Sequence, residues 1–413
     1  MGRRDALLRL SIMAALLLGG AMAPVFAADV KNLSVTVSSG TQANAYGGYT
    51  IEEGASALQN ALTLSGPAKV LGASAGGWSR WGNAEWNTLT IRLDEDGLLG
   101  PSDIVGGGVA ESEGGGAAVH NTVYIESGTV EGTVEGGVAV GINGVGDGTG
   151  DVLSNQVTMS GGTVYSVFGG ETGEGNANDN VVTIKGSAAV TGKSNAVYGG
   201  YTIDGNASGN IVNIEDDADI HGEIMGGYTR AGSLISGNKV NVTGGNVNEN
   251  TVYGVYTAYG DVLDNQAVIK GTGQAGSSDT NSVYAGFTNI GAAAGNILYI
   301  QDSAEIAGSA FAGYQGGFIS SETVERNQVF MSGGSVGGDL TGGGSNNGGE
   351  TLNNYVEITG GTVSGNVYSG FTDSADALEN TLTVAGGRVE GSLFGGYSNT
   401  CLLYTSPSPR DRG

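Results

Sequence analysis

The sequence has little cysteine, proline or positive charge for its length. Its 413 residues include one Cys and five Pro, and 16 Lys and Arg stand against 41 Asp and Glu. A single cysteine excludes a disulfide framework, so stability must come from packing and backbone pairing. A formal net charge of −25 argues against binding to nucleic acid or to anionic lipid.

Glycine is abundant, but the pattern of collagen is absent. The 79 glycines follow no Gly-X-Y period and are accompanied by almost no proline, which excludes a collagen triple helix. Apolar residues make up 39% of the chain, which excludes a disordered polar tract. No helical periodicity is visible, and after the first 27 residues no segment is apolar enough to span a membrane.

Residues 1–27 have the organisation of a secretory signal peptide. Three arginines precede an apolar stretch, which ends in a small-residue cleavage site at Ala27. The stretch is too short and wrongly flanked for a spanning helix. We therefore expect export from the cytoplasm, with the mature protein starting near Ala28.

One five-residue motif, Asn-x-apolar-x-apolar, recurs at intervals of 25 to 34 residues. Its alternation predicts a strand with one buried face, which the asparagine starts on the buried side. At a corner, an inward amide can bond the asparagine of the next repeat and nearby backbone groups, so we expect a structural asparagine ladder. The twelve motifs begin at Asn60, Asn87, Asn121, Asn155, Asn180, Asn210, Asn238, Asn265, Asn296, Asn327, Asn354 and Asn380.

Two further elements follow each motif. The first is an apolar pair four residues apart, such as Ile220 and Ile224, and the second is a segment such as "VYGGYT" at Val197. We predict three short strands and three corners in each repeat, with glycines supplying positive φ at the bends. A loop of variable length returns to the next asparagine.

A repeat of this size cannot bury its own apolar face, but stacked repeats can. We therefore predict an all-β fold: a single-stranded parallel β-helix, or β-solenoid, of about twelve coils of 25–34 residues over residues 28–400. The usual crossover preference makes it right-handed. At the spacing of parallel strands the rod would be roughly 60 Å long.

Aromatic residues gather on both sides of the Gly-Gly pair or its equivalent. Rings stacked from coil to coil stabilise sheets, so we interpret them as structural rather than ligand-binding. The predicted stacks contain Tyr46, Tyr49, Tyr198, Tyr201, Tyr228, Tyr253, Tyr256, Tyr284, Phe287, Phe311, Tyr314, Tyr368, Phe371, Phe394 and Tyr397.

The repeat is least regular in two segments. Residues 71–86 contain all three tryptophans, and residues 93–103 contain an acidic run and a proline. Either segment could be a loop that projects from the rod and binds a partner, or an irregular coil near the amino-terminal cap.

No constellation of catalytic residues is apparent. The only histidines, His120 and His221, occupy different phases of the repeat, and His221 is predicted to point outward. "GASAG" at Gly72–Gly76 matches a serine-hydrolase motif but has no strand-to-helix elbow. Carboxylates such as those of Glu215–Asp219 allow weak calcium binding at the surface, but no ligand pattern specifies it. We therefore expect no enzyme activity, catalytic residue, cofactor or metal centre.

Residues 30–400 resemble the passenger region of a Gram-negative autotransporter. The resemblance lies in the signal peptide, the Gly-, Asn- and Thr-rich coils with "VYGGYT" segments, the acidic surface and the absence of cysteine from the repeats. It implies a monomeric rod displayed at the cell surface by a carboxy-terminal outer-membrane β-barrel. It also implies an adhesin whose partner is a receptor or glycan on a host or neighbouring cell.

The chain departs from that family where a barrel would be expected. The repeats continue to Thr400, and the remaining "CLLYTSPSPRDRG", residues 401–413, resembles a translated transposon-type sequencing adapter. We interpret these residues, including Cys401, as a non-native tail on a truncated chain. The natural protein is then expected to continue beyond Thr400.

Three functions remain open. The first is a surface-displayed adhesin or structural stalk, the second a truncated carbohydrate-active β-helix enzyme of the polysaccharide lyase or hydrolase type, and the third a freely secreted structural cell-surface protein. A cluster of carboxylates and arginine on adjacent coils would favour the enzyme. A smooth rod with threonine-rich and aromatic ladders would favour the passenger.

Overall fold

The computed structural model describes residues 28–101, 104–111, 115–141, 148–193, 196–248, 250–276, 281–317, 322–346 and 348–400. All regular structure in these ranges is β-strand, and none of it forms a helix long and apolar enough to cross a membrane. The predicted signal peptide and the adapter-like tail lie outside the described residues.

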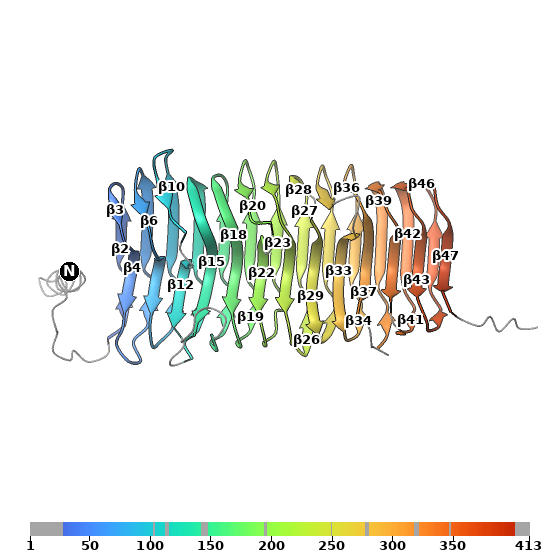
Figure 1. Ribbon diagram of the computed structural model, residues 1–413, viewed down its shortest axis with the longest axis horizontal. Coiled ribbons are helices and arrows are strands. Elements are labelled where there is room, and N and C mark those ends of the chain that lie inside the picture. The colour runs from blue at the N-terminus through green and yellow to red at the C-terminus, as the bar shows by residue number, and fades with distance from the viewer. Residues whose placement is uncertain are drawn as a thin grey trace, which may run out of the picture.

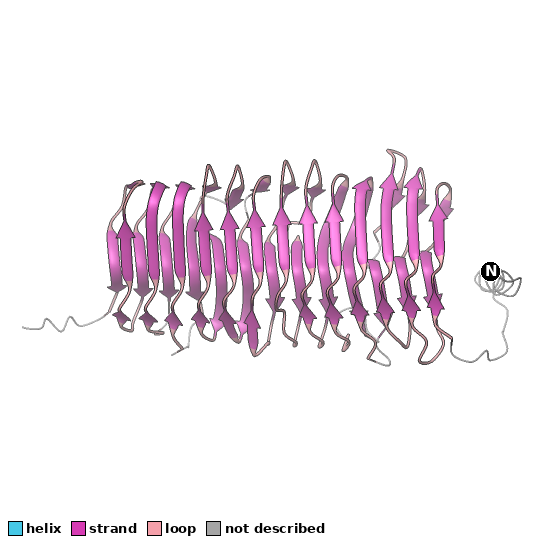
Figure 2. Ribbon diagram, turned by 180° about the vertical axis from the view of Figure 1, so that it is seen from behind, coloured by secondary structure: helices cyan, strands magenta, loops and turns pink. Residues whose placement is uncertain are grey.

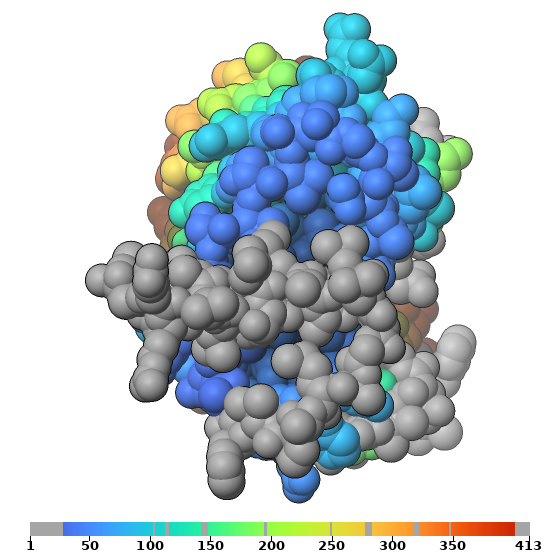
Figure 3. Space-filling view, turned by 90° about the vertical axis from the view of Figure 1, so that its left-hand side faces the viewer, coloured from blue at the N-terminus to red at the C-terminus, as the bar shows by residue number. Residues whose placement is uncertain are grey.

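The chain winds into one long rod of stacked coils (Figures 1 and 2). Each strand pairs in parallel with the equivalent strand of the neighbouring coil; for example, Val182 pairs with Val212, which pairs with Val240. Figure 3 looks along the rod from its N-terminal end, where later coils lie behind the first. The predicted all-β parallel solenoid of about twelve coils is therefore confirmed.

Each coil passes through up to four strand positions, which we call the ladder, short, glycine and return strands. Ladder strands follow the repeated asparagine, and an additional first one follows Leu33. The ladder strands are β2 (Ser34–Val37), β6 (Ala61–Gly66), β10 (Thr88–Leu93), β14 (Thr122–Ser127), β17 (Gln156–Met159), β20 (Val181–Ile184), β23 (Ile211–Ile214), β27 (Lys239–Val242), β31 (Gln266–Ile269), β35 (Ile297–Ile300), β39 (Gln328–Val336), β42 (Tyr355–Val363) and β45 (Thr381–Val384). β39 and β42 continue into the short position.

Glycine strands contain the Gly-Gly pair or its equivalent. They are β4 (Ala45–Thr50), β8 (Ser74–Ser79), β12 (Val105–Glu111), β15 (Thr129–Val140), β18 (Thr163–Thr172), β22 (Val197–Thr202), β25 (Ile224–Thr229), β29 (Val252–Tyr259), β33 (Asn281–Ile290), β37 (Ser309–Gln315), β40 (Leu340–Ser345), β43 (Val367–Thr372) and β47 (Leu393–Ser398). β15 and β18 also include the short position.

The short strands lie between the ladder and glycine strands. They are β3 (Thr41–Gln42), β7 (Lys69–Val70), β11 (Leu98–Leu99), β21 (Ala189–Val190), β24 (Asp219–Ile220), β28 (Asn246–Asn248), β32 (Gln274–Gly276), β36 (Glu305–Ile306) and β46 (Arg388–Val389).

The return strands were not predicted from the sequence, which indicated three strands per coil rather than four. They form two separate six-stranded sheets in the segment that was expected to be a loop. The first sheet contains β1 (Val30–Lys31), β5 (Ala57–Leu58), β9 (Ala84–Glu85), β13 (Ala118–Val119), β16 (Val152–Leu153) and β19 (Ala177–Asn178). The second contains β26 (Leu234–Ser236), β30 (Asp261–Leu263), β34 (Ala293–Ala294), β38 (Val324–Glu325), β41 (Thr351–Leu352) and β44 (Ala377–Leu378).

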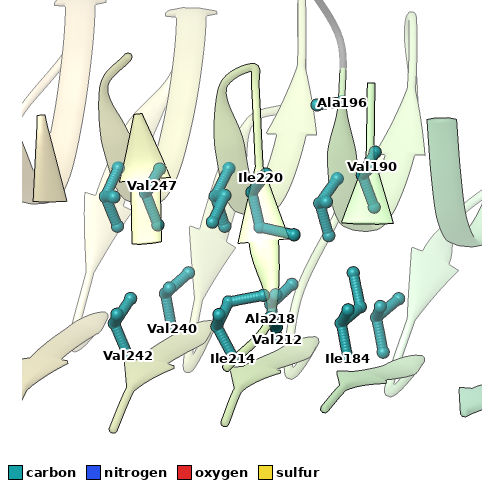
Figure 4. Packing of buried hydrophobic residues seen from close by; sticks show 14 of the residues in the cluster. Ile184, Val190, Ala196, Val212, Ile214, Ala218, Ile220, Val240, Val242 and Val247 are labelled. Atoms are coloured by element: carbon teal, nitrogen blue, oxygen red, sulfur yellow. The ribbon is translucent and has the colours of Figure 1, made fainter. Parts of the chain in front are cut away.

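The main core is an apolar column that runs along the rod, and two smaller buried clusters include residues of the return strands. Figure 4 shows two of its rows facing each other: Ile184, Ile214 and Val242 come from ladder strands, and Val190, Ile220 and Val247 come from the opposite side of the coil. All six side chains are at most 1% exposed. Because each row repeats a similar side chain at the strand spacing, every coil completes the core of its neighbours.

The residue before each repeated asparagine makes a left-handed bend that closes the coil. Its φ lies between 54° and 69° in all twelve repeats, and in nine of them it is not glycine. These residues are Gln59, Trp86, His120, Ser154, Asp179, Gly209, Gly237, Asp264, Gly295, Arg326, Asn353 and Glu379. The expectation that glycines beside the asparagine supply this bend holds at three of the twelve positions, Gly209, Gly237 and Gly295. The Gly-Gly pairs, such as Gly199 and Gly200, lie inside a strand without positive φ.

The two segments expected to be irregular are regular coil. Within residues 71–86, β8 pairs with both neighbouring glycine strands, and Trp78 lies between Tyr49 and Val109. Within residues 93–103, β11 pairs on both sides, and residues 102–103 lie outside the described part. The "SAGGWS" of β8 keeps the glycine pair and the second aromatic position of "VYGGYT", with Ala75 at the first aromatic position, which explains its fit.

Candidate functional site

The repeated asparagines form a continuous hydrogen-bonded ladder inside the rod. The backbone N of Asn87 donates to Oδ1 of Asn121 at 2.9 Å, and Asn87 Nδ2 donates to the same Oδ1 at 3.0 Å. Asn87 Nδ2 also donates to the carbonyl oxygen of Ala57, in the return strand of the preceding coil, at 2.9 Å. Each amide therefore uses both donors and its acceptor, which removes the penalty of burying it.

The same two hydrogen bonds, from the backbone N and Nδ2 of one asparagine to Oδ1 of the next, occur at all eleven steps from Asn60 to Asn380. Every one of these donor–acceptor distances lies between 2.9 and 3.1 Å. Asn60 to Asn354 are at most 1% exposed. The ladder therefore crosses every coil boundary after the first coil, at the positions that the sequence motif marks.

The Gly-Gly pair makes room for this ladder. A Cβ on Gly200 would lie 2.6 Å from Nδ2 of Asn210, and the second glycine of most other pairs meets the next asparagine in the same way. Val255 replaces that glycine before Asn265. There the bond from Asn265 Nδ2 to the carbonyl oxygen of Ile235 is 3.3 Å, longer than the 2.8 Å of the equivalent bond in the preceding coil.

The aromatic residues form two columns on the outer face of the glycine strands. Tyr198 and Tyr201 are three residues apart, yet both face outward, because the strand pairing passes from Tyr198 to Gly200 and skips Gly199. The first column contains Tyr46, Phe168, Tyr198, Tyr253, Tyr284, Phe311, Tyr368 and Phe394. The second contains Tyr49, Trp78, Tyr201, Tyr228, Tyr256, Phe287, Tyr314, Phe371 and Tyr397.

Ring faces in these columns mostly cover one another. Tyr228 stacks on Tyr201 with centroids 4.8 Å apart and on Tyr256 at 5.7 Å, with interplanar angles of 7° and 4°. Burial raises the pKa of Tyr201 and of Tyr314 to about 12, so both phenols ionise at a higher pH than an exposed tyrosine does. Rings whose faces are occupied by other rings offer few flat surfaces for a sugar, which supports a structural role.

The columns are interrupted by an acidic break, which we define as Glu135 and Glu171. Glu135 replaces an aromatic residue in the first column and is 1% exposed, while Glu171 replaces one in the second column. Burial raises the pKa of Glu171 to about 8. Separately, Trp78 Nε1 donates to Glu111 Oε1 at 2.7 Å, and Arg80 Nε lies 3.6 Å from Glu111 Oε2.

Glu135 and Glu171 occupy diagonal positions on adjacent coils. Val138, three residues after Glu135, pairs with Glu171. Rings that occupy the same diagonal elsewhere in the rod are in contact, with centroids 5.7 Å apart for Phe168 and Tyr201 and 6.0 Å for Tyr198 and Tyr228. The acidic break therefore places two carboxylates on neighbouring coils, a pair that the sequence analysis missed.

The histidines and the serine of the hydrolase-like motif are not brought together. His120 is exposed and stacks on Trp86 at 4.2 Å, whereas His221 bonds Asp219 at 2.9 Å in another part of the coil. Ser74, the serine of "GASAG", is fully buried in β8. These residues cannot form a serine-hydrolase triad.

Carboxylates of the predicted calcium-binding surface serve other contacts. Asp216 Oδ2 accepts a hydrogen bond from the backbone N of Gly186 at 3.1 Å, and Asp219 bonds His221. Across the described ranges, no three His, Cys, Asp or Glu side chains lie together as metal ligands would.

Comparison of the chain with protein-family models, curated proteins and solved structures finds no match. The functional argument therefore depends on the geometry of the rod itself.

Proposed function

We propose that this protein is an exported, surface-displayed β-helical passenger that acts as an adhesin or a structural stalk. The observation that carries the proposal is the ladder, which runs from Asn60 to Asn380 with the same bonds at every step. A uniform rod of this kind holds its length without a metal or a disulfide and presents a long surface. The predicted signal peptide and the resemblance to autotransporter passengers support export and display.

The test displays the full chain on bacterial cells through a heterologous outer-membrane anchor and measures adhesion to host cells and to a glycan array. A variant lacking residues 210–237 removes one ladder interval and should leave a folded, protease-resistant rod that is one coil shorter. We expect adhesion above that of the anchor alone. A stalk would not adhere, and the length of the displayed rod would fall by about 4.8 Å for each deleted coil. A displayed chain that neither adheres nor resists protease would contradict the proposal.

A second candidate, a carbohydrate-active enzyme, is favoured by the acidic break alone. Glycoside hydrolases use two carboxyl groups, one of which has a raised pKa. Glu135 and Glu171 are two carboxyl groups on adjacent coils, and the pKa of Glu171 is raised. The test measures release of reducing ends or of unsaturated sugars from a polysaccharide panel. Activity that Glu135→Gln and Glu171→Gln abolish, and that the exposed Glu131→Gln on the same strand as Glu135 retains, would establish the enzyme.

A further inference from the structure

Trp86 is a large aromatic residue that the rod exposes in a strained conformation. Its side chain is 55% exposed, and its φ of 58° lies in the left-handed region, which bulky residues avoid. Gly209 and Gly237 make the same bend in later coils without that strain. The bend therefore does not require a tryptophan, and the exposed ring contributes little to the core, so its position points to a role outside the fold.

His120 covers one face of the Trp86 ring. The two ring centroids are 4.2 Å apart, with an interplanar angle of 27°. The backbone N of Trp86 donates to the carbonyl oxygen of Val119, which places His120 on the following coil. Within the described ranges no other ring and no cation contacts Trp86, and Gln59, at the same position of the preceding coil, is exposed. The indole face turned toward the preceding coil is therefore available to a partner.

A carboxylate lies directly beside this ring. Glu85 is half-buried on the outer side of β9, and its Oε1 accepts a hydrogen bond from Asn83 Nδ2 at 2.8 Å. That bond is the only one that the carboxylate makes with the described residues, and it leaves lone pairs on both oxygens. Since Glu85 and Trp86 are consecutive, their Cα atoms are about 3.8 Å apart, and one ligand can reach both side chains.

A second tryptophan, at the other end of β9, already holds an arginine. Cζ of Arg80 lies 5.9 Å from the centroid of the Trp81 ring, and Nε of the same arginine lies 3.6 Å from Glu111 Oε2. Trp78 orients that carboxylate by donating to its other oxygen at 2.7 Å. A guanidinium suits such a pair, because its plane stacks on an aromatic ring and its N–H groups match a carboxylate. The tryptophan–glutamate pair after β9 has the same two groups, but no arginine from the described ranges.

We propose that Trp86 and Glu85 bind an arginine side chain of a partner polypeptide. The guanidinium stacks on the open indole face and donates to the Glu85 carboxylate, while His120 lies against the opposite face of the ring. The formal net charge of −25 attracts such a cationic partner over a longer range. The site gives the adhesin a partner chemistry and in that respect rests on the proposed function, but binding in solution tests it without display or adhesion.

Two other ligands suit the site less well. A neutral sugar could stack on the indole face, but it brings no positive charge to the Glu85 carboxylate. A lysine brings the charge as a compact ammonium, which lacks the planar, forked geometry of a guanidinium. Arginine is therefore expected to bind more tightly than either.

The experiment titrates the unmodified full chain with the end-blocked peptide Gly-Gly-Arg-Gly-Gly and follows the indole N–H resonances of Trp78, Trp81 and Trp86 by NMR. Matched peptides carry lysine or citrulline, the neutral isostere of arginine. We expect saturable shifts at Trp86 alone, with a dissociation constant on the order of 1 mM, and roughly fivefold weaker binding of both matched peptides. Equal affinity for the arginine and citrulline peptides would overturn the proposal. Shifts at Trp86 with maltotriose but not with the arginine peptide would identify a sugar as the ligand and also overturn it.

Two variants separate this site from general attraction to the acidic rod, with binding followed by the line widths of the arginine peptide. Trp86→Asn removes the ring and keeps the bend, because Asn353 has a φ of 55° at the same position of a later coil. We expect it to abolish binding, and we expect Glu85→Gln, which keeps the ring, to weaken binding about tenfold. Tyr165→Ala removes an exposed ring elsewhere and Glu131→Gln the same charge, and both should bind as the parent does. Binding that either Trp86→Asn or Glu85→Gln leaves unchanged would overturn the proposal.

Discussion

Gly200 lies directly against the side chain of Asn210: a Cβ on this glycine would be 2.6 Å from Nδ2 of the asparagine. The neighbouring Gly199 closely approaches the backbone of Gly226, but Ala285 and Ala312 occupy the same position in later coils. Gly200 is therefore required by the close approach of the asparagine rather than by backbone torsion.

We predict that Gly200→Ala destabilises the rod by about 1–3 kcal/mol, because the added methyl must displace the ladder amide of Asn210. Gly199→Ala should cost less, because Ala285 and Ala312 occupy the same position in other coils. Gly395→Ala, at the equivalent of Gly199 in the last coil, meets only one atom at 3.6 Å and should cost far less. Denaturant unfolding of the three variants tests this. Equal losses of stability in the three variants would show that glycine is required by backbone torsion and not by contact with the next coil.

A second prediction concerns the left-handed bend before each asparagine. Gly209 has a φ of 68° and Arg326 a φ of 54°. Gly209→Ala should cost about 1 kcal/mol, because a Cβ strains this conformation. Arg326→Gly should be nearly neutral or stabilising, whereas Thr183→Gly, inside β20, should cost roughly 0.5–1 kcal/mol. If Arg326→Gly lowers the melting temperature as much as Thr183→Gly does, the bend is not strained.

The third prediction is a pH dependence that arises from Glu171. Because burial raises the pKa of this carboxyl from 4.5 to about 8, the folded state holds a proton that the unfolded state has released. Its contribution to stability is complete below pH 4.5 and is lost as the pH rises through 8. Glu171→Gln should therefore stabilise the protein at pH 9 by about 1–3 kcal/mol relative to the parent.

Urea unfolding at pH 5 and pH 9 measures this effect. The exposed Glu131→Gln is the control and should leave the difference between the two pH values unchanged. A parent whose stability is the same at both pH values would show that Glu171 is not protonated in the folded rod.

The fourth prediction concerns the aromatic columns. Tyr228 stacks on a ring above and a ring below, so Tyr228→Ala should cost about 3 kcal/mol. The 48% exposed Tyr165 should tolerate alanine with little loss. A double-mutant cycle between Tyr201 and Tyr228 should give a coupling energy of about 0.5–1.5 kcal/mol. A coupling energy of zero would contradict a structural role for the stack.

Local patterns in the sequence predicted most of the fold. The alternation after each asparagine identifies the ladder strand without knowledge of its neighbours, and the repetition of that strand predicts stacking. The return strands were missed because two residues, such as Ala57–Leu58, are too few for a periodicity. The ladder strand of the first coil was missed because Leu33 replaces its asparagine.

The acidic break could not be found from composition. Glu135 and Glu171 are 36 residues apart and become diagonal neighbours only through the register of β15 and β18. Aligning the repeats on their glycine pairs would have placed both carboxylates in aromatic positions, which is the signal that was available.

The asparagine ladder holds the coils together, and two asparagines that lie three positions apart test this claim. Asn210, fully buried in the ladder, precedes β23, and the half-buried Asn213 lies on the outer side of the same strand. Unfolding free energies of Asn210→Ala and Asn213→Ala should be compared. The ladder predicts a loss of about 2–4 kcal/mol at Asn210, because the buried donors of Asn180 would be left unsatisfied. It predicts less than about 1 kcal/mol at Asn213, whose side-chain bonds to Thr183 and Asn241 are only part-buried. Equal losses at the two positions would contradict the account.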